Sequence, residues 1–321
     1  MQPVVLLGFG QGELPGDALD RVRAIAPNYE VVIADKSDTV EKYLDRVEIA
    51  VRHVSLSLLA RAPLLRWYHH WYAGVDWLER FPGIRESEVT VTNASGVHTV
   101  SVTEHLLSMM LAFARNLHLN VRAQARREWR KETMDALFEL AGKRVLVVGL
   151  GAIGTHFARA AQSLGMTVTA IRRHAIASTD AAARVYGPEH LHGELGKADF
   201  VVIILPATPD TRKLFTAREF EAMREGSYFI NVGRGSIVDE TALVQALRSG
   251  RIRGAGLDVF ETEPLPADSP LWDMDQVIIT PHMGGYTPEY FRRSWPIFTE
   301  NLKRYVEGRP LVNVVDKGAG Y

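Results

Sequence analysis

The stretch RVLVVGLGAIGTHFARAAQSLGMTV, residues 144–168, constrains the fold more than any other part of the chain. Gly149, Gly151 and Gly154 form the pattern G-x-G-x-x-G after an apolar strand and before an amphipathic helix, and a second strand follows. The first glycine permits a tight turn, the second lets backbone N–H groups approach a pyrophosphate, and the third lets helix and strand pack closely. The stretch therefore predicts a β-α-β unit that binds a dinucleotide.

The segment VTAIRRHAIAST, residues 168–179, lies where such a unit distinguishes NAD from NADP. An acid here would bind the ribose 2′-hydroxyl of NAD, whereas an arginine binds the 2′-phosphate of NADP. Arg172 and Arg173 occupy the position, and the segment has no acid. We therefore expect NADP(H) to be preferred and NAD(H) to be possible. Two solvated arginines at a strand end are the alternative interpretation.

Short apolar runs alternate with amphipathic stretches along most of the chain, which predicts an α/β fold with parallel sheets. With 321 residues, two domains are expected. The second series of expected strands begins after Ala141 and comprises residues 143–151, 166–173, 198–206, 226–233, 252–260 and 276–282.

A long stretch, residues 99–132, separates the two series. Its early part is apolar on nearly all sides, which predicts a helix buried in the core or against another subunit. Its later part, RAQARREWRK, is strongly charged and is interpreted as a solvated helix face. Near the C-terminus, PEYFRRSWPIFTENLKRYVEGRP predicts one long helix that returns to the first domain.

Composition excludes several classes of function. The 37 basic and 38 acidic side chains give a formal net charge of −1, which favours neither nucleic acid nor membrane as a partner. Because there is no cysteine, disulfides and thiolate catalysis are excluded. No signal peptide or membrane span is recognised, so we expect a cytoplasmic protein. His190, His192 and Glu194 have spacing that suits a metal, but no further ligand stands nearby, and no metal site is expected.

Reactive side chains follow three of the expected strands of the second series. They are Arg234 in FINVGRGSIVDE, Asp258 and Glu263 in GAGLDVFETEPLP, and His282 in VIITPHMGG. Ligand sites of parallel sheets gather at the carboxyl ends of the strands, so these residues are expected to converge beside the dinucleotide.

These motifs carry a family resemblance. GLGAIG, NVGRGSIVDE, GAGLDVFETEPLP and TPHMGG, in this order, resemble the D-isomer-specific 2-hydroxyacid dehydrogenases. The resemblance extends to WYAGVDWL and VTNASGVHTVSVTEHLLSMMLA and covers about residues 70 to 290. Within the family, AIRRH is similar to the NADPH-using glyoxylate and hydroxypyruvate reductases.

The resemblance implies two Rossmann-like or flavodoxin-like domains, with the dinucleotide domain inserted into the substrate domain. Residues 1–98 and 288–321 would form the substrate domain and residues 99–287 the NAD(P)-binding domain. It also implies a hinge motion that closes the active site. The helix that begins near Ser101 resembles the dimer-forming element of the family, so a homodimer is expected. Trp129 lies where related reductases carry a tryptophan that reaches the neighbouring active site.

The resemblance also implies catalytic roles. Arg234 would bind the substrate carboxylate, and His282 would donate a proton to the carbonyl oxygen, since imidazoles titrate near neutral pH. Glu263 would pair with His282 and is chosen over Glu261 because the family places this acid immediately before proline. Asp258 would meet the nicotinamide carboxamide.

Further contacts follow from matching positions. For the cofactor they are Thr99, Gly149, Gly151, Ala152, Ile153, Gly154, Arg172, Arg173, Pro206, Thr208, Val232, Gly233, Asp258, His282 and Gly284. For the substrate they are Ala73, Gly74, Arg234 and His282. The chain departs from the family at His98 and Val100, where leucine and aspartate are common, so contacts there are expected to differ.

The expected function is reduction of a 2-ketoacid to a D-2-hydroxyacid, with hydride from the nicotinamide and glyoxylate or hydroxypyruvate as leading substrates. A bulkier 2-ketoacid or ketopantoate is one alternative. A dinucleotide-sensing regulatory protein on the same scaffold is another. The joint presence of Arg234, Glu263 and His282 argues against the sensor, which would need only the glycine loop.

Overall fold

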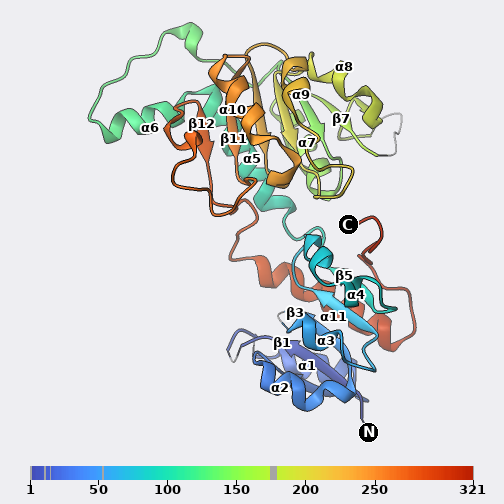
Figure 1. Ribbon diagram of the computed structural model, residues 1–321. Coiled ribbons are helices and arrows are strands. Elements are labelled where there is room, and N and C mark those ends of the chain that lie inside the picture. Colours follow the sequence, from blue (N-terminus) through green and yellow to red (C-terminus); the bar gives the residue numbers. More distant parts are fainter. Residues whose placement is uncertain (1, 11, 15, 53, 174–178, 321) are drawn as a thin grey trace. The chain divides into compact units, whose positions relative to one another are not determined.

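The computed structural model describes residues 2–10, 12–14, 16–52, 54–173 and 179–320. The chain divides into two compact units (Figure 1). Unit 1 comprises Met1–Val97 and Pro288–Tyr321, and unit 2 comprises His98–Thr287. Each unit contains one sheet whose strands are all parallel, which confirms the α/β fold with parallel sheets.

Unit 1 has a five-stranded sheet in the order β2-β1-β3-β4-β5, the flavodoxin-like arrangement. Its strands are β1 Val4–Gly8, β2 Glu30–Ile33, β3 Val47–Arg52, β4 Trp67–His70 and β5 Thr90–Asn93. Its α-helices are α1 Ala18–Ile25, α2 Ser37–Tyr43, α3 Leu56–Leu59, α4 Pro82–Arg85 and α11 Tyr290–Val306.

Both faces of this sheet are buried. In β1, Val4 and Leu6 belong to one apolar core, and Val5 and Leu7 belong to the other. Successive side chains of a strand point to opposite faces, so a run of apolar residues is what a sheet covered on both sides requires. Helices α2, α3 and α4 supply the first core, and α1 and α11 supply the second.

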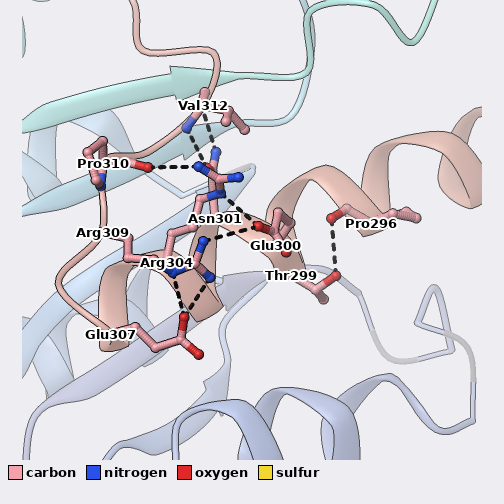
Figure 2. Close-up of polar contacts among 9 residues, drawn as sticks. All are labelled: Pro296, Thr299, Glu300, Asn301, Arg304, Glu307, Arg309, Pro310 and Val312. Carbon is pink, nitrogen blue, oxygen red and sulfur yellow. Dashed lines mark hydrogen bonds and ion pairs between the residues drawn. The ribbon is translucent and has the colours of Figure 1, made fainter.

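The C-terminal segment is held on unit 1 by a polar network at the end of α11 (Figure 2). The side chain of Asn301 is fully buried and exchanges two hydrogen bonds with the backbone of Val312, of 2.9 and 2.8 Å. Arg304 pairs with Glu300 at 2.7 Å and donates to the carbonyl oxygen of Pro310 at 3.2 Å. The chain after the helix therefore folds back along α11.

Unit 2 has a seven-stranded sheet in the order β12-β11-β10-β9-β6-β7-β8. Its strands are β6 Arg144–Val148, β7 Thr167–Ile171, β8 Arg184–Tyr186, β9 Phe200–Ile203, β10 Ser227–Asn231, β11 Ile252–Leu257 and β12 Val277–Ile279. Its α-helices are α5 Thr99–Ala114, α6 Leu117–Ala125, α7 Ala152–Ser163, α8 Leu191–Leu195, α9 Ala217–Ala222 and α10 Glu240–Arg248.

Helices cover both faces of the second sheet. Alternate residues of β6 again belong to different cores: Val145 and Val147 pack with α5 and α7, whereas Leu146 and Val148 pack with α8, α9 and α10. Helix α5 thus contributes to the core of unit 2.

Among the described residues, no helix combines the length and apolar character that crossing a lipid bilayer requires.

Two details differ from the expectations. The helix predicted over RAQARREWRK ends at Ala125, so the interpretation as a helix face is wrong for the rest of that stretch. Arg127 takes a left-handed φ of 60°, and the N–H of Glu128 donates to the carbonyl oxygen of Ala123 at 2.9 Å. This geometry is a Schellman motif in which Arg127 takes the left-handed position that glycine usually holds. Because an arginine does not mark a helix end, the sequence did not predict this one. Strand β8 was also not expected.

A buried histidine lies in the aromatic core of unit 1. His69 has no exposed surface, and its Nδ1 lies 2.8 Å from the hydroxyl oxygen of Thr92, which also accepts the indole N–H of Trp67. Burial, with a smaller contribution from His70, lowers the pKa of His69 to about 3. The folded protein therefore keeps this imidazole neutral over most of the acidic range.

We predict that His69 makes unit 1 less stable in acid. An unfolded histidine binds a proton below about pH 6.5, whereas folded His69 binds it only near pH 3. The free energy of unfolding should therefore decrease as the pH falls through this window, with up to about 1.4 kcal/mol per pH unit from His69. Urea denaturation followed by tryptophan fluorescence should show a shallower pH dependence in His69→Gln than in wild type, and no such change in the exposed control His190→Gln. Equal slopes in wild type and His69→Gln would contradict the prediction.

Candidate active site

The strand ends of unit 2 bring the expected site residues to one edge of its sheet. His282, Asp258 and Arg234 follow the neighbouring strands β12, β11 and β10, and the glycine loop follows β6. The chain order reverses between β6 and β9, because β6, β7 and β8 lie on one side and β9 to β12 on the other. In doubly wound sheets, ligands bind at the carboxyl edge beside such a reversal.

The three glycines differ in what surrounds them. Gly149 has φ of +112°, and a Cβ there would lie 2.4 Å from the carbonyl oxygen of Ile204. A Cβ on Gly154 would lie 2.2 Å from the carbonyl oxygen of Gly149, so this position admits no side chain without a shift. Gly151 precedes α7, and a Cβ on it would meet nothing within 4 Å. The space above Gly151 and the N-terminus of α7, with Ala152 and Ile153 in its first turn, suit a pyrophosphate.

The two arginines lie just beyond β7. Both are exposed, and the N–H of Arg172 donates to the carbonyl oxygen of Tyr186 at 2.9 Å, continuing the pairing with β8. The guanidinium of Arg173 lies 3.3 Å from a carboxylate oxygen of Asp210. His174 and the four residues after it lie outside the described residues.

The loop that carries Arg234 is fixed by Asn231. The buried amide of Asn231 accepts the N–H of Gly233 at 3.0 Å and donates to the carbonyl oxygen of Arg234 at 3.1 Å. A Cβ on Gly235 would lie 1.8 Å from the carbonyl oxygen of Phe260, so the loop packs directly on the segment that leads to Glu263. The guanidinium of Arg234 is half-buried and lies 2.9 Å from the carbonyl oxygen of Gly233.

His282 and Glu263 are in direct contact. The Nδ1 atom of His282 lies 2.7 Å from one carboxylate oxygen of Glu263, and the other carboxylate oxygen accepts the N–H of Phe260 at 3.0 Å. His282 has φ of 52°, a left-handed conformation that costs energy in a residue with a side chain. Its N–H donates to the carbonyl oxygen of Asp258 at 2.8 Å. Since Nδ1 faces Glu263, Nε2 is the nitrogen that can serve a substrate.

Asp258 organises the loop that carries His282. One of its carboxylate oxygens accepts the hydroxyl of Thr280 at 2.6 Å and the N–H of Met283 at 2.9 Å, and the other accepts the N–H of Gly284 at 2.9 Å. Burial alone would raise the pKa of Asp258, but hydrogen bonds from His105, Thr280 and these two N–H groups lower it below its ordinary value. The carboxylate is therefore kept charged while it binds the loop backbone.

The remaining expected contacts are distributed over both units. Pro206 and Thr208 follow β9, Val232 and Gly233 follow β10, and Thr99 is the first residue of α5, all in unit 2. Ala73 and Gly74 follow β4 in unit 1, where the amide of Asn93 donates to the carbonyl oxygen of Ala73 at 2.7 Å.

The metal-like spacing of HLHGE does not produce one cluster. His190 lies 2.9 Å from Glu189, His192 lies 2.9 Å from Glu219, and Glu194 pairs with Lys197 at 2.7 Å. Each side chain therefore has a different partner.

Sequence reasoning missed the part that α5 plays in the site. The Nε2 atom of His105 lies 2.9 Å from the hydroxyl oxygen of Thr280, which itself donates to Asp258. The imidazole of His98, where the family commonly has leucine, lies 3.0 Å from the carbonyl oxygen of Gly285. A signal was present: polar Ser101, His105 and Ser108 recur at helical spacing in a mostly apolar stretch. Exposed Met283 and Tyr286, beside His282, were also not singled out.

Comparison with known proteins agrees with this architecture. The family model described as "D-isomer specific 2-hydroxyacid dehydrogenase, NAD binding domain" matches residues 107–284, the region that contains the glycine loop, Arg234, Glu263 and His282. The chain belongs to the D-isomer specific 2-hydroxyacid dehydrogenase family.

Individual members of the family match over most of the chain. Glyoxylate/hydroxypyruvate reductase B of Salmonella typhimurium is 35% identical over 272 residues, which cover 83% of this chain and 82% of that protein. D-3-phosphoglycerate dehydrogenase of Methanocaldococcus jannaschii is 31% identical over 92% of this chain, but the chain spans only 57% of that relative. Among solved structures, the chain is similar to a D-isomer specific 2-hydroxyacid dehydrogenase from Xanthobacter autotrophicus Py2, crystallised in complex with NADPH and MES. The alignment covers 100% of each chain, with 33% identity and a TM-score of 0.85.

The unequal surroundings of Gly151 and Gly154 lead to a test of the glycine loop. Gly151→Ala should fold with the thermal stability of wild type and bind NADPH more weakly, because a methyl group would occupy the space above α7. Gly154→Ala should lower the melting temperature, because its Cβ would collide with the carbonyl oxygen of Gly149. Thermal unfolding and NADPH fluorescence titration measure the two effects. Weakened stability in Gly151→Ala with unchanged NADPH binding would contradict this assignment.

Proposed function

We propose that this chain reduces a small 2-ketoacid to the D-2-hydroxyacid with NADPH. The observation that carries the proposal is the contact between His282 and Glu263 at the carboxyl edge of a dinucleotide-type sheet. Membership of a dehydrogenase family supports the reaction type. The name of the Salmonella relative makes glyoxylate and hydroxypyruvate the leading substrates.

The catalytic roles follow from charge. When bound, the nicotinamide supplies the hydride that adds to C2 of the ketoacid. Arg234 binds the substrate carboxylate through its planar guanidinium and attracts the negative charge that grows on the carbonyl oxygen. His282 donates the proton from Nε2 to that oxygen, and the Glu263 carboxylate at Nδ1 stabilises the protonated imidazole and fixes its orientation. The proton and the hydride together complete the reduction.

The residues of the glycine loop and β7 fit NADP(H). The open space at Gly151 and the first turn of α7 would hold the pyrophosphate, with Thr99, Pro206, Thr208, Val232, Gly233 and Gly284 as further contacts. Arg172 and Arg173 would bind the 2′-phosphate, and the NADPH complex of the Xanthobacter relative supports this preference. NAD(H) remains a second cofactor. Asp258 orders the His282 loop and retains a lone pair for the nicotinamide carboxamide.

The two units have separate roles in this proposal. Unit 2 is the NAD(P)-binding domain, with the boundary near residues 98 and 288. Unit 1 is the substrate domain, in which the N–H groups of Ala73 and Gly74 bind the carboxylate. The Asn93 side chain holds this loop through the carbonyl oxygen of Ala73. A cytoplasmic location is part of the same proposal.

A cofactor assay tests the proposal. Wild type should oxidise NADPH faster than NADH with glyoxylate or hydroxypyruvate, and Arg172→Asp should lose that preference. Loss of one charge-assisted contact is worth about 2 kcal/mol, or roughly thirtyfold in kcat/KM for NADPH. Arg248→Asp, which reverses the charge of another exposed arginine of unit 2, is the matched control and should keep the preference.

Two results would redirect the proposal. Equal use of both cofactors by wild type would leave Arg172 and Arg173 as solvated side chains. Tight NADPH binding without turnover of glyoxylate, hydroxypyruvate, pyruvate, phenylpyruvate or ketopantoate would favour the dinucleotide-sensing protein, whereas turnover of only the larger acids would change the substrate.

We also infer that the chain forms a homodimer through α6 and the segment after it. Figure 1 shows this part extending from the rest of unit 2. Large apolar side chains are exposed along it, namely Leu117, Val121, Trp129 and Met134, the last two almost completely. A hollow of about 500 Å³, lined in part by Gln124 and Trp129, lies beside α6. A second copy would cover this apolar surface.

The dimer is tested by the double variant Leu117→Asp and Val121→Asp. The two residues lie one turn apart on α6 and are more than half exposed, so the charges should disrupt an interface without unfolding the helix. Light scattering after gel filtration should give twice the 35.8 kDa chain mass for wild type and the chain mass for the variant. The exposed Leu164→Asp is the control and should remain a dimer. A monomeric wild type would refute the inference.

A further inference from the structure

A cluster of three charged side chains lies beside the proposed catalytic residues and is not part of the proposed catalytic set. Lys213 stands between β9 and α9, Glu240 is the first residue of α10, and Glu261 follows β11. One carboxylate oxygen of Glu261 accepts both the Lys213 ammonium and, at 2.7 Å, the N–H of Glu240. In return, the carboxylate of Glu240 accepts the N–H of Glu261 at 3.3 Å. The three side chains therefore join three separate segments of unit 2.

Two of these segments carry the proposed catalytic groups. Glu261 stands two residues before Glu263, and Glu240 stands six residues after Arg234. The packing of Gly235 on Phe260 keeps the two segments together. A cavity of about 10 Å³ remains between them, lined in part by Asn231 and Glu240, which is room for one water molecule at most.

The backbone of Phe260 and Glu261 connects the cluster to the catalytic pair. The N–H of Phe260 donates to one carboxylate oxygen of Glu263, and the other oxygen faces Nδ1 of His282. The adjacent N–H, that of Glu261, donates to Glu240. A displacement of this backbone would therefore move Glu263 relative to His282.

Lys213 is itself held in an unusual conformation. Its φ is 52°, in the left-handed region that residues with a Cβ rarely adopt. Its N–H donates to the carbonyl oxygen of Ser236 at 2.8 Å, and the next pairing, from the N–H of Phe215 to Ile237, is 3.0 Å. The segment with Lys213 thus runs along the loop after Arg234, which brings the ammonium to Glu261.

The charges show what the lysine contributes to the cluster. Glu240 is half-buried, and burial together with the negative charge of Glu261 raises its pKa, while the hydrogen bond from the Glu261 N–H and the charge of Lys213 oppose this effect. The two carboxylates repel each other, and the Lys213 ammonium, which pairs with Glu261, offsets part of this repulsion. Removing the ammonium would therefore push the two loops apart.

We propose that Lys213, Glu240 and Glu261 are positioning residues that keep the Glu263 carboxylate at hydrogen-bond distance from Nδ1 of His282. None of the three contacts His282 in the described structure, so they act only through the loop backbone. This inference rests on the proposed function for its kinetic consequences, but the geometry that it describes is independent of the substrate.

The kinetic test is Lys213→Met, assayed with NADPH and glyoxylate. Misplacement of a catalytic group by about 1 Å costs up to roughly a hundredfold in rate, so kcat should fall by about ten- to a hundredfold. The dissociation constant of NADPH should stay within about twofold of wild type, because the cluster is separate from the glycine loop. Lys213→Arg, which restores the cation, should recover most of kcat. A simple loss of fold would instead weaken NADPH binding as well.

The matched control is Lys197→Met, which removes another lysine paired with a glutamate in unit 2, at 2.7 Å from Glu194. It should leave kcat unchanged. Equal kcat values for wild type, Lys213→Met and Lys197→Met would overturn the proposal.

A second measurement keeps the two proposals distinguishable. Hydrogen exchange of the peptide that contains residues 258–264 needs no substrate, and it should be faster in Lys213→Met than in wild type and Lys197→Met. If wild type turns over no ketoacid but this difference appears, the proposed function fails and the positioning cluster stands. If wild type is active and exchange and kcat are unchanged in Lys213→Met, the cluster proposal fails alone.

Discussion

The parallel sheet of unit 2 is the constraint on which the site depends. Its strands are buried on both faces, so the polar groups that act on ligands can stand only where the strands end. Because all seven strands run in the same direction, the loops after β6, β7, β9, β10, β11 and β12 leave from one edge. A phosphate-type loop and the proposed catalytic groups are thereby brought together from residues that are 80 to 133 positions apart.

The loops at this edge are ordered by hydrogen bonds to backbone groups. Asn231 fixes the turn with Arg234, and Asp258 binds two N–H groups beyond His282. These buried polar side chains are surrounded by apolar strands, where an unmade hydrogen bond would be costly. The proposed function therefore depends on the side chains that hold Arg234 and His282 as well as on these two residues themselves.

The fold was predictable because the pattern that indicates each β-α-β unit lies within one continuous stretch of the sequence. Apolar runs and the glycine pattern identify strands β6 and β7 with α7, and the positions of Arg234, Glu263 and His282 follow from motifs of at most 13 residues. The contact of Glu263, and not Glu261, with His282 is a structural finding that agrees with the expected pair. Their catalytic roles stay predictions.

Other features could not be predicted because they depend on residues far apart in the chain. His105 meets Thr280 across 175 positions, and Lys213 meets Glu261 across 48. The end of α6 depends on the left-handed backbone of Arg127, for which an arginine is no signal. Tertiary packing decides these contacts, and composition or periodicity does not reveal them.

The most direct test of the account is a double-mutant cycle on kcat/KM for NADPH-dependent reduction of glyoxylate, with Glu263→Gln, His282→Asn and the double variant. If His282 donates the proton and Glu263 acts only through it, His282→Asn should lose about a hundred- to ten-thousandfold, and the double variant should lose no more. Single losses that multiply in the double variant would mean that the two residues act independently, and would contradict the account.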